Sequence, residues 1–218
     1  MPSTKKLPGE NVRKLAAERQ QSAMLRYAAS IGVLVGTVML FSILGTSSLG
    51  VLLSLGGLAG SYYLYRSGQH LMKRADDAQR GAKAETEVAE LLRPLKRKGW
   101  QVEYNLRIKR WGDADVVLHS LKGNWYVVDV KSHGGTKVFE DSRLRKRYGR
   151  KIYYFKEGDL IDKVKGQAKE VKNLKGARSV TALLCFTKGD VDILGNKAGG
   201  VYVVAAADLV SILLRLDR

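Results

Sequence analysis

The sequence predicts an α/β domain, a sheet with helices on its faces, preceded by two apolar helices. Two observations lead to this prediction. Residues 27–65 contain no Asp, Glu, Lys, Arg or His, whereas the segments after residue 81 alternate between helical and strand patterns. With 45% hydrophobic and 27% charged residues, the chain of 218 residues is too apolar to be disordered. Its single cysteine, Cys185, excludes an internal disulfide and a cysteine-based zinc cluster.

The charge of the chain favours an anionic partner. Lys and Arg number 38 against 21 Asp and Glu, which gives a formal net charge of +17. A surplus of this size indicates nucleic acid or anionic lipid head groups as the first candidates. We expect no small-molecule cofactor.

The apolar run is long enough for two membrane passes. As one helix, at about 1.5 Å per residue, it would reach about 58 Å, roughly twice a hydrocarbon core of about 30 Å. A break at 45–50 leaves transmembrane helices at about 27–44 and 49–65. Basic residues flank both ends, which predicts a multi-pass hairpin in the cell membrane with both termini and the C-terminal domain in the cytoplasm. Small residues spaced by four would let the two helices approach closely: Gly32, Gly36, Gly56 and Gly60.

The predicted organisation has four parts. They are a basic cytoplasmic lead-in at 1–26, the transmembrane hairpin at 27–65, a basic juxtamembrane linker at 66–80 and a compact domain at 81–218. Two other structures remain open for the apolar run. One is a buried pair of core helices in a soluble protein, and the other, because each span is short, is a re-entrant hairpin that does not cross the membrane.

Sequence patterns predict each element of the domain at 81–218 in turn. A helix over 83–92 has apolar residues at helical spacing and ends near Pro94. Strands at 114–119 and 125–131 form a hairpin that turns at 121–124. The other expected elements are a strand at 100–106, a short strand at 152–155, a helix at 160–174, a strand at 179–186, a strand at 201–204 and a helix at 206–216.

The expected hairpin brings two carboxylates together. With its centre near Lys122, Asp115 and Asp129 are cross-strand neighbours, and Lys131 lies on the same face because side chains alternate along a strand. Two carboxylates about 5 Å apart repel each other, so they need a cation or a shared proton. Oxygen ligands of this kind suit Mg²⁺ or Mn²⁺. The alternative for Asp129 and Lys131 is a surface ion pair.

Glu85 lies on the apolar face of its predicted helix. Val88, Ala89 and Leu92 follow it at helical spacing, and a carboxylate on such a face needs a partner. The alternative is a carboxylate near a helix N-terminus, where the helix dipole favours it.

Three segments resemble the motifs of a known family. The segments 81–85 (GAKAE), 112–118 (GDADVVL) and 126–131 (YVVDVK) are similar to those of the nuclease-related domain, NERD, within the PD-(D/E)XK restriction-endonuclease-like superfamily. The resemblance covers about 81–216 and extends to Gln167 and the apolar strand at 180–186. The sequence departs from the family pattern at Ala84, where glycine is usual, and has aspartate at Asp129, where glutamate is also common.

The resemblance implies a mixed sheet flanked by helices and metal-dependent hydrolysis of phosphodiester bonds. The implied ligands of Mg²⁺ are Asp115, Asp129, the backbone carbonyl of Val130 and, directly or through water, Glu85. Lys131 would orient or activate the attacking water and stabilise charge on the phosphate. Gln167 would support the site, although from the residues alone it is equally well a solvated glutamine on its helix.

A basic loop is expected just after the third motif. Its six cations are Arg143, Arg145, Lys146, Arg147, Arg150 and Lys151. Such a loop beside a metal site suits binding of a phosphate backbone, and anionic lipid is the alternative. Two functions are therefore open: a membrane-anchored Mg²⁺-dependent nuclease acting on DNA, with RNA second, or a noncatalytic membrane-tethered module that binds nucleic acid or a protein. His133 is expected to be an ordinary loop residue.

Overall fold

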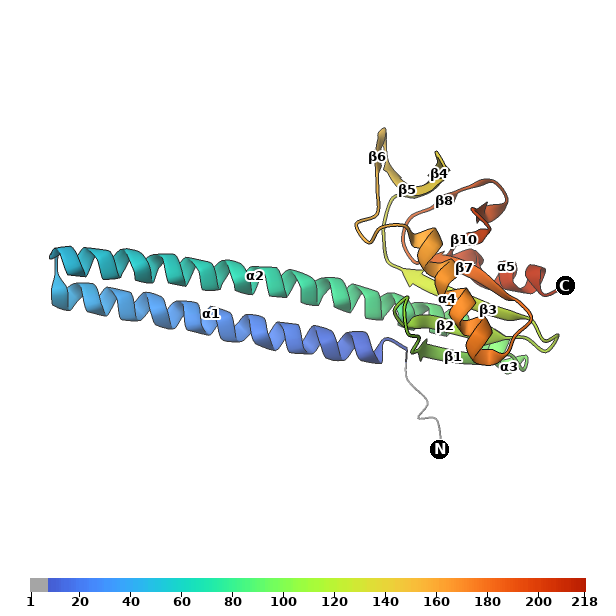
Figure 1. The fold of residues 1–218 in the computed structure, drawn as a ribbon, viewed down its shortest axis with the longest axis horizontal. Helices are drawn as coiled ribbons and strands as arrows, with labels where there is room; N and C mark the ends of the chain where they lie inside the picture. Colours follow the sequence, from blue (N-terminus) through green and yellow to red (C-terminus); the bar gives the residue numbers. More distant parts are fainter. Residues whose placement is uncertain (1–7) are drawn as a thin grey trace, which may run out of the picture. The chain divides into compact units, whose positions relative to one another are not determined.

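The computed structural model describes residues 8–218 (Figure 1). The chain divides into two compact units. Asn11–Arg80 forms one, and Gly81–Arg218 forms the other together with the described residues before Asn11. The first seven residues of the predicted lead-in lie outside the described residues.

The first unit is a hairpin of two long helices. α1 spans Glu10–Leu44 and α2 spans Ser48–Leu91, so the turn between them falls within the break expected at 45–50. Gly45 has a φ of +58°, a left-handed conformation that favours glycine at the end of a helix. Both helices extend beyond the apolar run, because the polar residues on each side of it are helical too.

Small side chains at a seven-residue period form the contact between α1 and α2. The buried residues of α1 are Ala16, Ala23, Ser30 and Thr37. The hydroxyl groups of Ser30 and Ser61 lie 3.1 Å apart, and each donates to the carbonyl of the other residue at 2.9 Å. A Cβ atom at Gly57 would lie 2.0 Å from Thr37 Oγ1, so only glycine fits there. The four glycines expected at this contact have open space around them instead, because a seven-residue period rather than a four-residue one keeps paired helices in register.

Large apolar side chains of this unit face outward. Ile31, Ile43, Leu52 and Leu55 are each at least 60% exposed. An exposed apolar surface of this extent is typical of a site that contacts another protein or a membrane. Within residues 8–218, α1 is the one helix that is long and apolar enough to cross a membrane. The number of passes and their orientation stay predictions.

A six-stranded mixed sheet forms the centre of the second unit, in the order β1-β2-β3-β7-β10-β9. β1, β2 and β3 pair antiparallel, β7 and β10 run parallel to β3, and β9 is antiparallel to β10. The bounds are β1 Gln101–Leu106, β2 Ala114–His119, β3 Trp125–Lys131, β7 Val180–Phe186, β9 Lys197–Ala198 and β10 Val201–Ala205. The α/β fold class expected from the sequence is confirmed.

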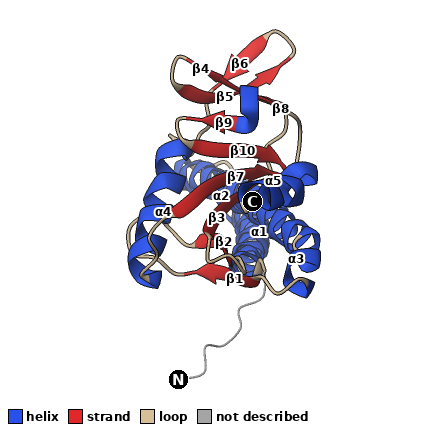
Figure 2. Ribbon diagram, turned by 90° about the vertical axis from the view of Figure 1, so that its right-hand side faces the viewer, coloured by secondary structure: helices blue, strands red, loops and turns tan. Residues whose placement is uncertain are grey.

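Helices cover both faces of this sheet (Figure 2). On one face α4, Leu160–Lys175, shares a buried apolar core with Val117 and Val127. On the other face α3, Arg93–Arg97, and α5, Leu209–Leu216, share a second core with the end of α2. Two short 3-10 helices complete the fold, η1 Leu194–Asn196 and η2 Ala206–Asp208.

A second sheet, in the order β6-β5-β4-β8, carries the basic residues. The bounds are β4 Thr136–Glu140, β5 Arg143–Tyr148, β6 Lys151–Tyr153 and β8 Val191–Asp192. The expectation of a basic loop is wrong: β4, β5 and β6 form an antiparallel ribbon, here called the basic ribbon. Its first turn passes through Asp141 and Ser142, whose φ angles of 49° and 60° are typical of a type I′ hairpin turn. Leu144 is buried, as alternation along a strand would have it, but the charged residues around it give β5 no alternating apolar pattern in the sequence.

Candidate active site

The β2–β3 hairpin has the register expected from the sequence. Val116 pairs with Val128, and Val117 pairs with Val127. One step further along, this register sets Asp115 opposite Asp129 on the face of the sheet that α4 covers. Asp129 is fully buried and Asp115 is half-buried.

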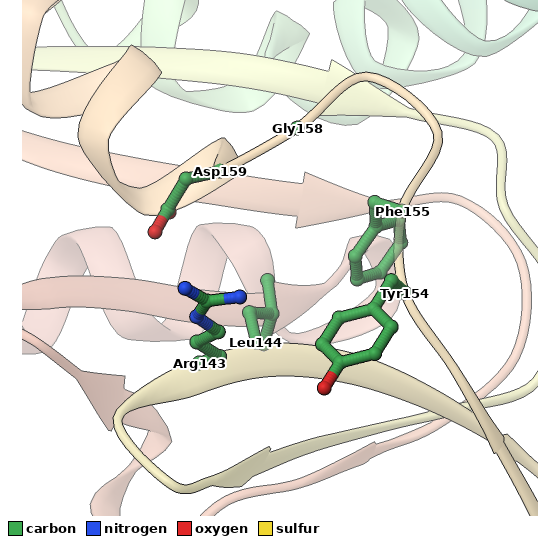
Figure 3. A pocket seen from close by; sticks show the side chains of 6 residues that line it. All are labelled: Arg143, Leu144, Tyr154, Phe155, Gly158 and Asp159. Atoms are coloured by element: carbon green, nitrogen blue, oxygen red, sulfur yellow. The ribbon is translucent and has the colours of Figure 1, made fainter.

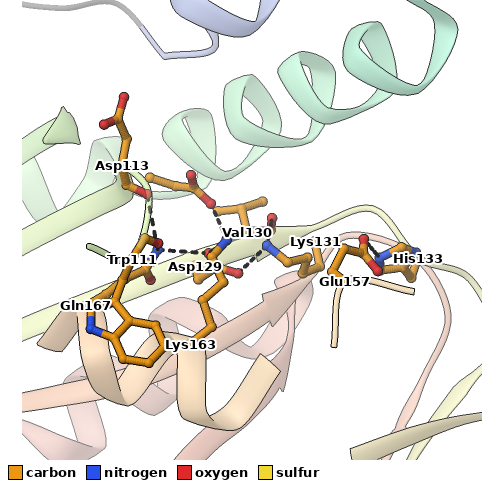
Figure 4. Close-up of polar contacts among 10 residues, drawn as sticks. Trp111, Asp113, Asp129, Val130, Lys131, His133, Glu157, Lys163 and Gln167 are labelled. Carbon is orange, nitrogen blue, oxygen red and sulfur yellow. Dashed lines mark hydrogen bonds and ion pairs between the residues drawn. The ribbon is translucent and has the colours of Figure 1, made fainter. Parts of the chain in front are cut away.

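Three side chains surround the Asp129 carboxylate (Figure 4). Oδ2 forms an ion pair with Lys131 Nζ, and Oδ1 lies 3.1 Å from Lys163 Nζ. Gln167 Nε2 donates a hydrogen bond to Oδ1 at 3.3 Å. Burial alone would raise the pKa of Asp129, but the charges of Lys131 and Lys163 outweigh burial and lower it. Asp129 is therefore ionised, and the expectation of a surface ion pair is wrong because the carboxylate has no contact with solvent.

The pKa of Asp115 is shifted in the direction opposite to that of Asp129. Its Oδ2 accepts a hydrogen bond from Val130 N at 2.7 Å. Burial, and next the charge of Asp129, raise the pKa of Asp115 to about 8. For Lys131, burial acts to lower the pKa, but the Asp129 and Asp115 carboxylates raise it overall. Asp115 therefore keeps its proton to higher pH than Asp129, whose charge is balanced by Lys131 and Lys163.

Helix α4 supplies Lys163 and Gln167 from the same face, one turn apart. The helix begins at Asp159, whose Oδ1 accepts from Ile161 N at 2.9 Å and Asp162 N at 3.2 Å. Sequence reasoning missed Lys163; its four-residue spacing from Gln167 is the signal that could have found it.

Gln167 is fixed by the turn that precedes β2. Its Nε2 donates to Asp113 O at 3.1 Å and reaches Trp111 O at 3.4 Å. Trp111 in turn packs on α4 at Gly166, where a Cβ atom would lie 2.2 Å from the indole ring. Gln167 is fully buried, so the alternative of a solvated glutamine is wrong. Its Oε1 is a buried acceptor without a hydrogen-bond partner among the described residues.

Glu85 is also a buried carboxylate. Its Oε2 accepts a hydrogen bond from Gly9 N at 2.9 Å. Glu85 lies in the interior of α2, which rules out the helix N-terminus alternative, and α2 packs on the face of the sheet opposite α4. Its charge adds a smaller contribution to the raised pKa of Asp115.

The donor atoms near Asp129 suit a hard divalent cation. Among residues 8–218, no group of three or more His, Cys, Asp or Glu side chains lies close enough together to hold a metal ion. The available donors are the carboxylates of Asp115 and Asp129, the carbonyl of Val130, which Lys131 Nζ approaches at 3.4 Å, and the unpartnered Gln167 Oε1. All are oxygen atoms, the ligand type that Mg²⁺ and Mn²⁺ prefer.

His133 forms a second polar pair beyond Lys131. Its Nε2 lies 2.7 Å from Glu157 Oε1, and its ring meets Phe155 edge-on with centroids 5.3 Å apart. The hydrogen bond from His133 is the main cause that lowers the pKa of Glu157 to about 2, and Lys131 adds a smaller effect. His133 lies in a loop as expected, but its partner was not foreseen.

The six predicted cations of the basic ribbon fall into two groups. Arg145 contacts Asp141 at 2.8 Å, and Arg147 contacts Asp192 at 2.7 Å. The other four predicted cations form no ion pair within the described part of the chain: Arg143, Lys146, Arg150 and Lys151. These four are available to an anionic ligand.

A protein-family model matches part of the chain. Residues 80–187 match the family model described as the nuclease-related domain, NERD. The matched segment includes every residue of the Asp129 cluster and the whole basic ribbon. No curated protein and no solved structure matches the chain. The match indicates a nuclease-related function and a nuclease-like enzyme, and it supports the assignment of residues 80–187 to the NERD family.

Proposed function

We propose that this protein is a membrane-anchored, Mg²⁺-dependent nuclease of the restriction-endonuclease-like superfamily that hydrolyses phosphodiester bonds of DNA, with RNA the second choice. The observation that carries the proposal is the Asp129 carboxylate. It is buried, ionised and contacted by Lys131, Lys163 and Gln167, and it faces Asp115 across the hairpin. Buried charged groups of this kind are concentrated at catalytic sites.

Each residue of the cluster has a proposed role. Asp115, Asp129 and the Val130 carbonyl would hold the metal, with Gln167 Oε1 close by and Glu85 acting through water. When bound, Mg²⁺ would polarise a phosphoryl oxygen and lower the pKa of a bound water. Lys131 would orient the water that attacks phosphorus and would stabilise the charge that develops on the phosphate.

The basic ribbon would bind the nucleic-acid backbone. Its four cations without an ion pair can each contact a phosphate, and such contacts give affinity without sequence preference. The paired Arg145 and Arg147 would instead hold the ribbon in shape.

The first unit would anchor the protein in a membrane. Its outer surface carries large apolar side chains, while the contact between its helices is made of small side chains, alanine, serine and threonine, which suits lipid as the solvent. Two passes with both termini in the cytoplasm follow from the basic residues on each side of the apolar run. Carbonate extraction should leave the full chain in the membrane pellet, and labelling of a terminal tag from outside intact cells would contradict the orientation.

One observation favours a second candidate, a noncatalytic tethered module that binds nucleic acid or a protein. The charge of Asp129 is already balanced by two lysines, so the cluster is complete without a metal. In that case the ion pairs of Asp129 would stabilise the fold and take no part in catalysis.

A cleavage assay separates the two candidates. The full chain, purified in detergent, is incubated with labelled single- and double-stranded DNA and with RNA, in Mg²⁺ or in EDTA. We expect cleavage in Mg²⁺ alone, lost in Lys131→Met and kept in Lys172→Met, an exposed lysine of α4 that serves as the matched control. Equal cleavage by the wild type and Lys131→Met would place the activity elsewhere. No cleavage of any substrate would favour the noncatalytic module.

A further inference from the structure

A pocket of about 340 Å³ lies between β5, the segment that follows β6 and the start of α4 (Figure 3). Its lining residues are Arg143, Leu144, Tyr154, Phe155, Gly158 and Asp159. None of these residues belongs to the cluster around Asp129. The volume lies near the lower end of the range for ligand sites, about 300–1,000 Å³, and suits one small flat group rather than a duplex.

The lining combines three kinds of chemistry. Leu144 and Phe155 are buried apolar side chains, whereas Arg143 is exposed and forms no ion pair with a described residue. Asp159 uses Oδ1 to cap α4, and the hydrogen bonds of the described residues leave its Oδ2 open. The pocket therefore offers a cation for a phosphate and a carboxylate for an N–H donor around an apolar base.

Tyr154 provides an aromatic surface at the edge of this pocket. The Arg145 guanidinium lies 4.9 Å from the centre of its ring, and Arg145 is itself fixed by its ion pair with Asp141. Tyr154 is nevertheless 60% exposed, which leaves ring surface available for a ligand. An aromatic ring supported by arginine is a platform on which nucleobases stack.

Covalent continuity joins this pocket to the Asp129 cluster on two sides. Asp159 precedes Lys163 by four residues, about 6 Å along the helix axis at about 1.5 Å per residue, and Lys163 contacts Asp129. The segment that carries Tyr154 and Phe155 also carries Glu157, which pairs with His133, two residues after Lys131.

We propose that the pocket is a nucleobase subsite, which receives an unstacked base of the strand whose phosphate lies at the Asp115–Asp129 pair. The proposal rests on the proposed nuclease function and deepens it. The base would stack on Tyr154 and donate an amino hydrogen to Asp159, while Arg143 would contact the adjoining phosphate. A base inside a duplex would have to leave its stack to enter, so the preferred substrate is a single strand or a frayed end.

Binding measurements on the full chain in detergent and EDTA test the proposal. The probes are short labelled oligodeoxynucleotides: a normal single strand, the same strand built of abasic residues, and the duplex. We expect the wild type to bind the normal strand about tenfold more tightly than the abasic strand, since stacking of one base on an aromatic residue contributes about that factor. Tyr154→Leu should remove this preference, and Tyr154→Phe should keep it. Tyr153→Leu, an exposed tyrosine one residue away and outside the pocket lining, is the matched control.

Equal affinity of the wild type for normal and abasic strands would overturn the subsite, as would an unchanged preference in Tyr154→Leu. Parallel cleavage assays in Mg²⁺ separate this failure from that of the proposed function. Cleavage without a base preference would leave the nuclease standing and overturn the subsite. A base preference without cleavage would support the subsite and count against the nuclease. Loss of both would overturn both.

Discussion

The Asp129 cluster and the basic ribbon both hold several cations, but they hold them in different ways. In the cluster, the side chains of Asp129 and Lys131 are 1% and 12% exposed, and each charge contacts another. In the ribbon, the carboxylates that pair with Arg145 and Arg147 are exposed, Asp141 by 79% and Asp192 by 65%. Water screens the second kind of pair but hardly the first. A substitution in the cluster should therefore have a large effect specific to its position, whereas substitutions in the ribbon should have small effects that add.

The largest expected effect follows from removal of the buried charge. Asp129→Asn should lower cleavage by about a thousandfold, since a charged metal ligand is lost. It should also lower the free energy of unfolding by about 3 kcal/mol, because two lysines are left without a buried counter-ion. Single-turnover kinetics and urea denaturation measure the two quantities. Asp162→Asn, an exposed carboxylate at the start of α4, is the control and should change both little. A stable and active Asp129→Asn protein would mean that the buried charges of the Asp129 cluster matter no more than the exposed charges of the basic ribbon.

The second effect concerns the support of the cluster rather than its charges. Gly166→Ala places a methyl group against the Trp111 ring, so the turn that holds Gln167 must move. Overpacking of this kind costs about 1–3 kcal/mol in the free energy of unfolding. Thermal or urea unfolding measures the loss, and Trp111→Ala combined with Gly166→Ala should recover part of it. If the double variant is no more stable than Gly166→Ala alone, the close approach of Trp111 to α4 is not what fixes Gln167.

The contrast also explains which parts of the site could be predicted from the sequence. The Asp115–Asp129 pairing depends on strand alternation and one short turn, both of which are local. Lys163 could not be paired with Asp129 in this way, because the contact depends on how α4 packs through Gly166 and Trp111. Glu85 was correctly expected to be buried, but its hydrogen bond to Gly9 spans 76 residues and leaves no local pattern.

The ribbon was mistaken for a loop for a different reason. Its turn at Asp141 and Ser142 lacks the glycine that usually marks a two-residue hairpin, and the positions of β5 before Tyr148 that are not buried are all basic. The helix hairpin shows a similar limit: its break was predicted from composition, whereas its contact surface follows a seven-residue period that starts before the apolar run, at Ala16.

Lys163 should show an intermediate effect. Lys163→Met removes an ammonium group that competes with a cation for Asp129 Oδ1. We expect Mg²⁺ affinity to rise, because this competitor is gone, while cleavage falls by about tenfold through the loss of one phosphate-stabilising charge. Calorimetric Mg²⁺ titration and single-turnover rates measure the two changes. Lys165→Met, an exposed lysine on the same helix, should leave both unchanged. A fall in both quantities together would mean that Lys163 supports the metal ligands instead of competing with the metal.

The smallest effect for each residue belongs to the ribbon, where it becomes measurable only as a sum. Joint replacement of Lys146, Arg150 and Lys151 by alanine removes cations without an ion pair, which are free to bind phosphates. Each lost phosphate contact lowers the slope of log affinity against log salt by about 0.7–0.9, so the slope should fall by about 2–3. Arg145→Ala with Arg147→Ala is the matched comparison, because both side chains are already paired with carboxylates and their loss should change the slope by less than one unit. Fluorescence anisotropy at several salt concentrations gives both slopes, and vesicles with anionic head groups provide the lipid probe.

Equal slopes in the two variants would show that internal pairing does not decide which cations bind. A change in vesicle binding without a change in nucleic-acid binding would assign the ribbon to the membrane surface.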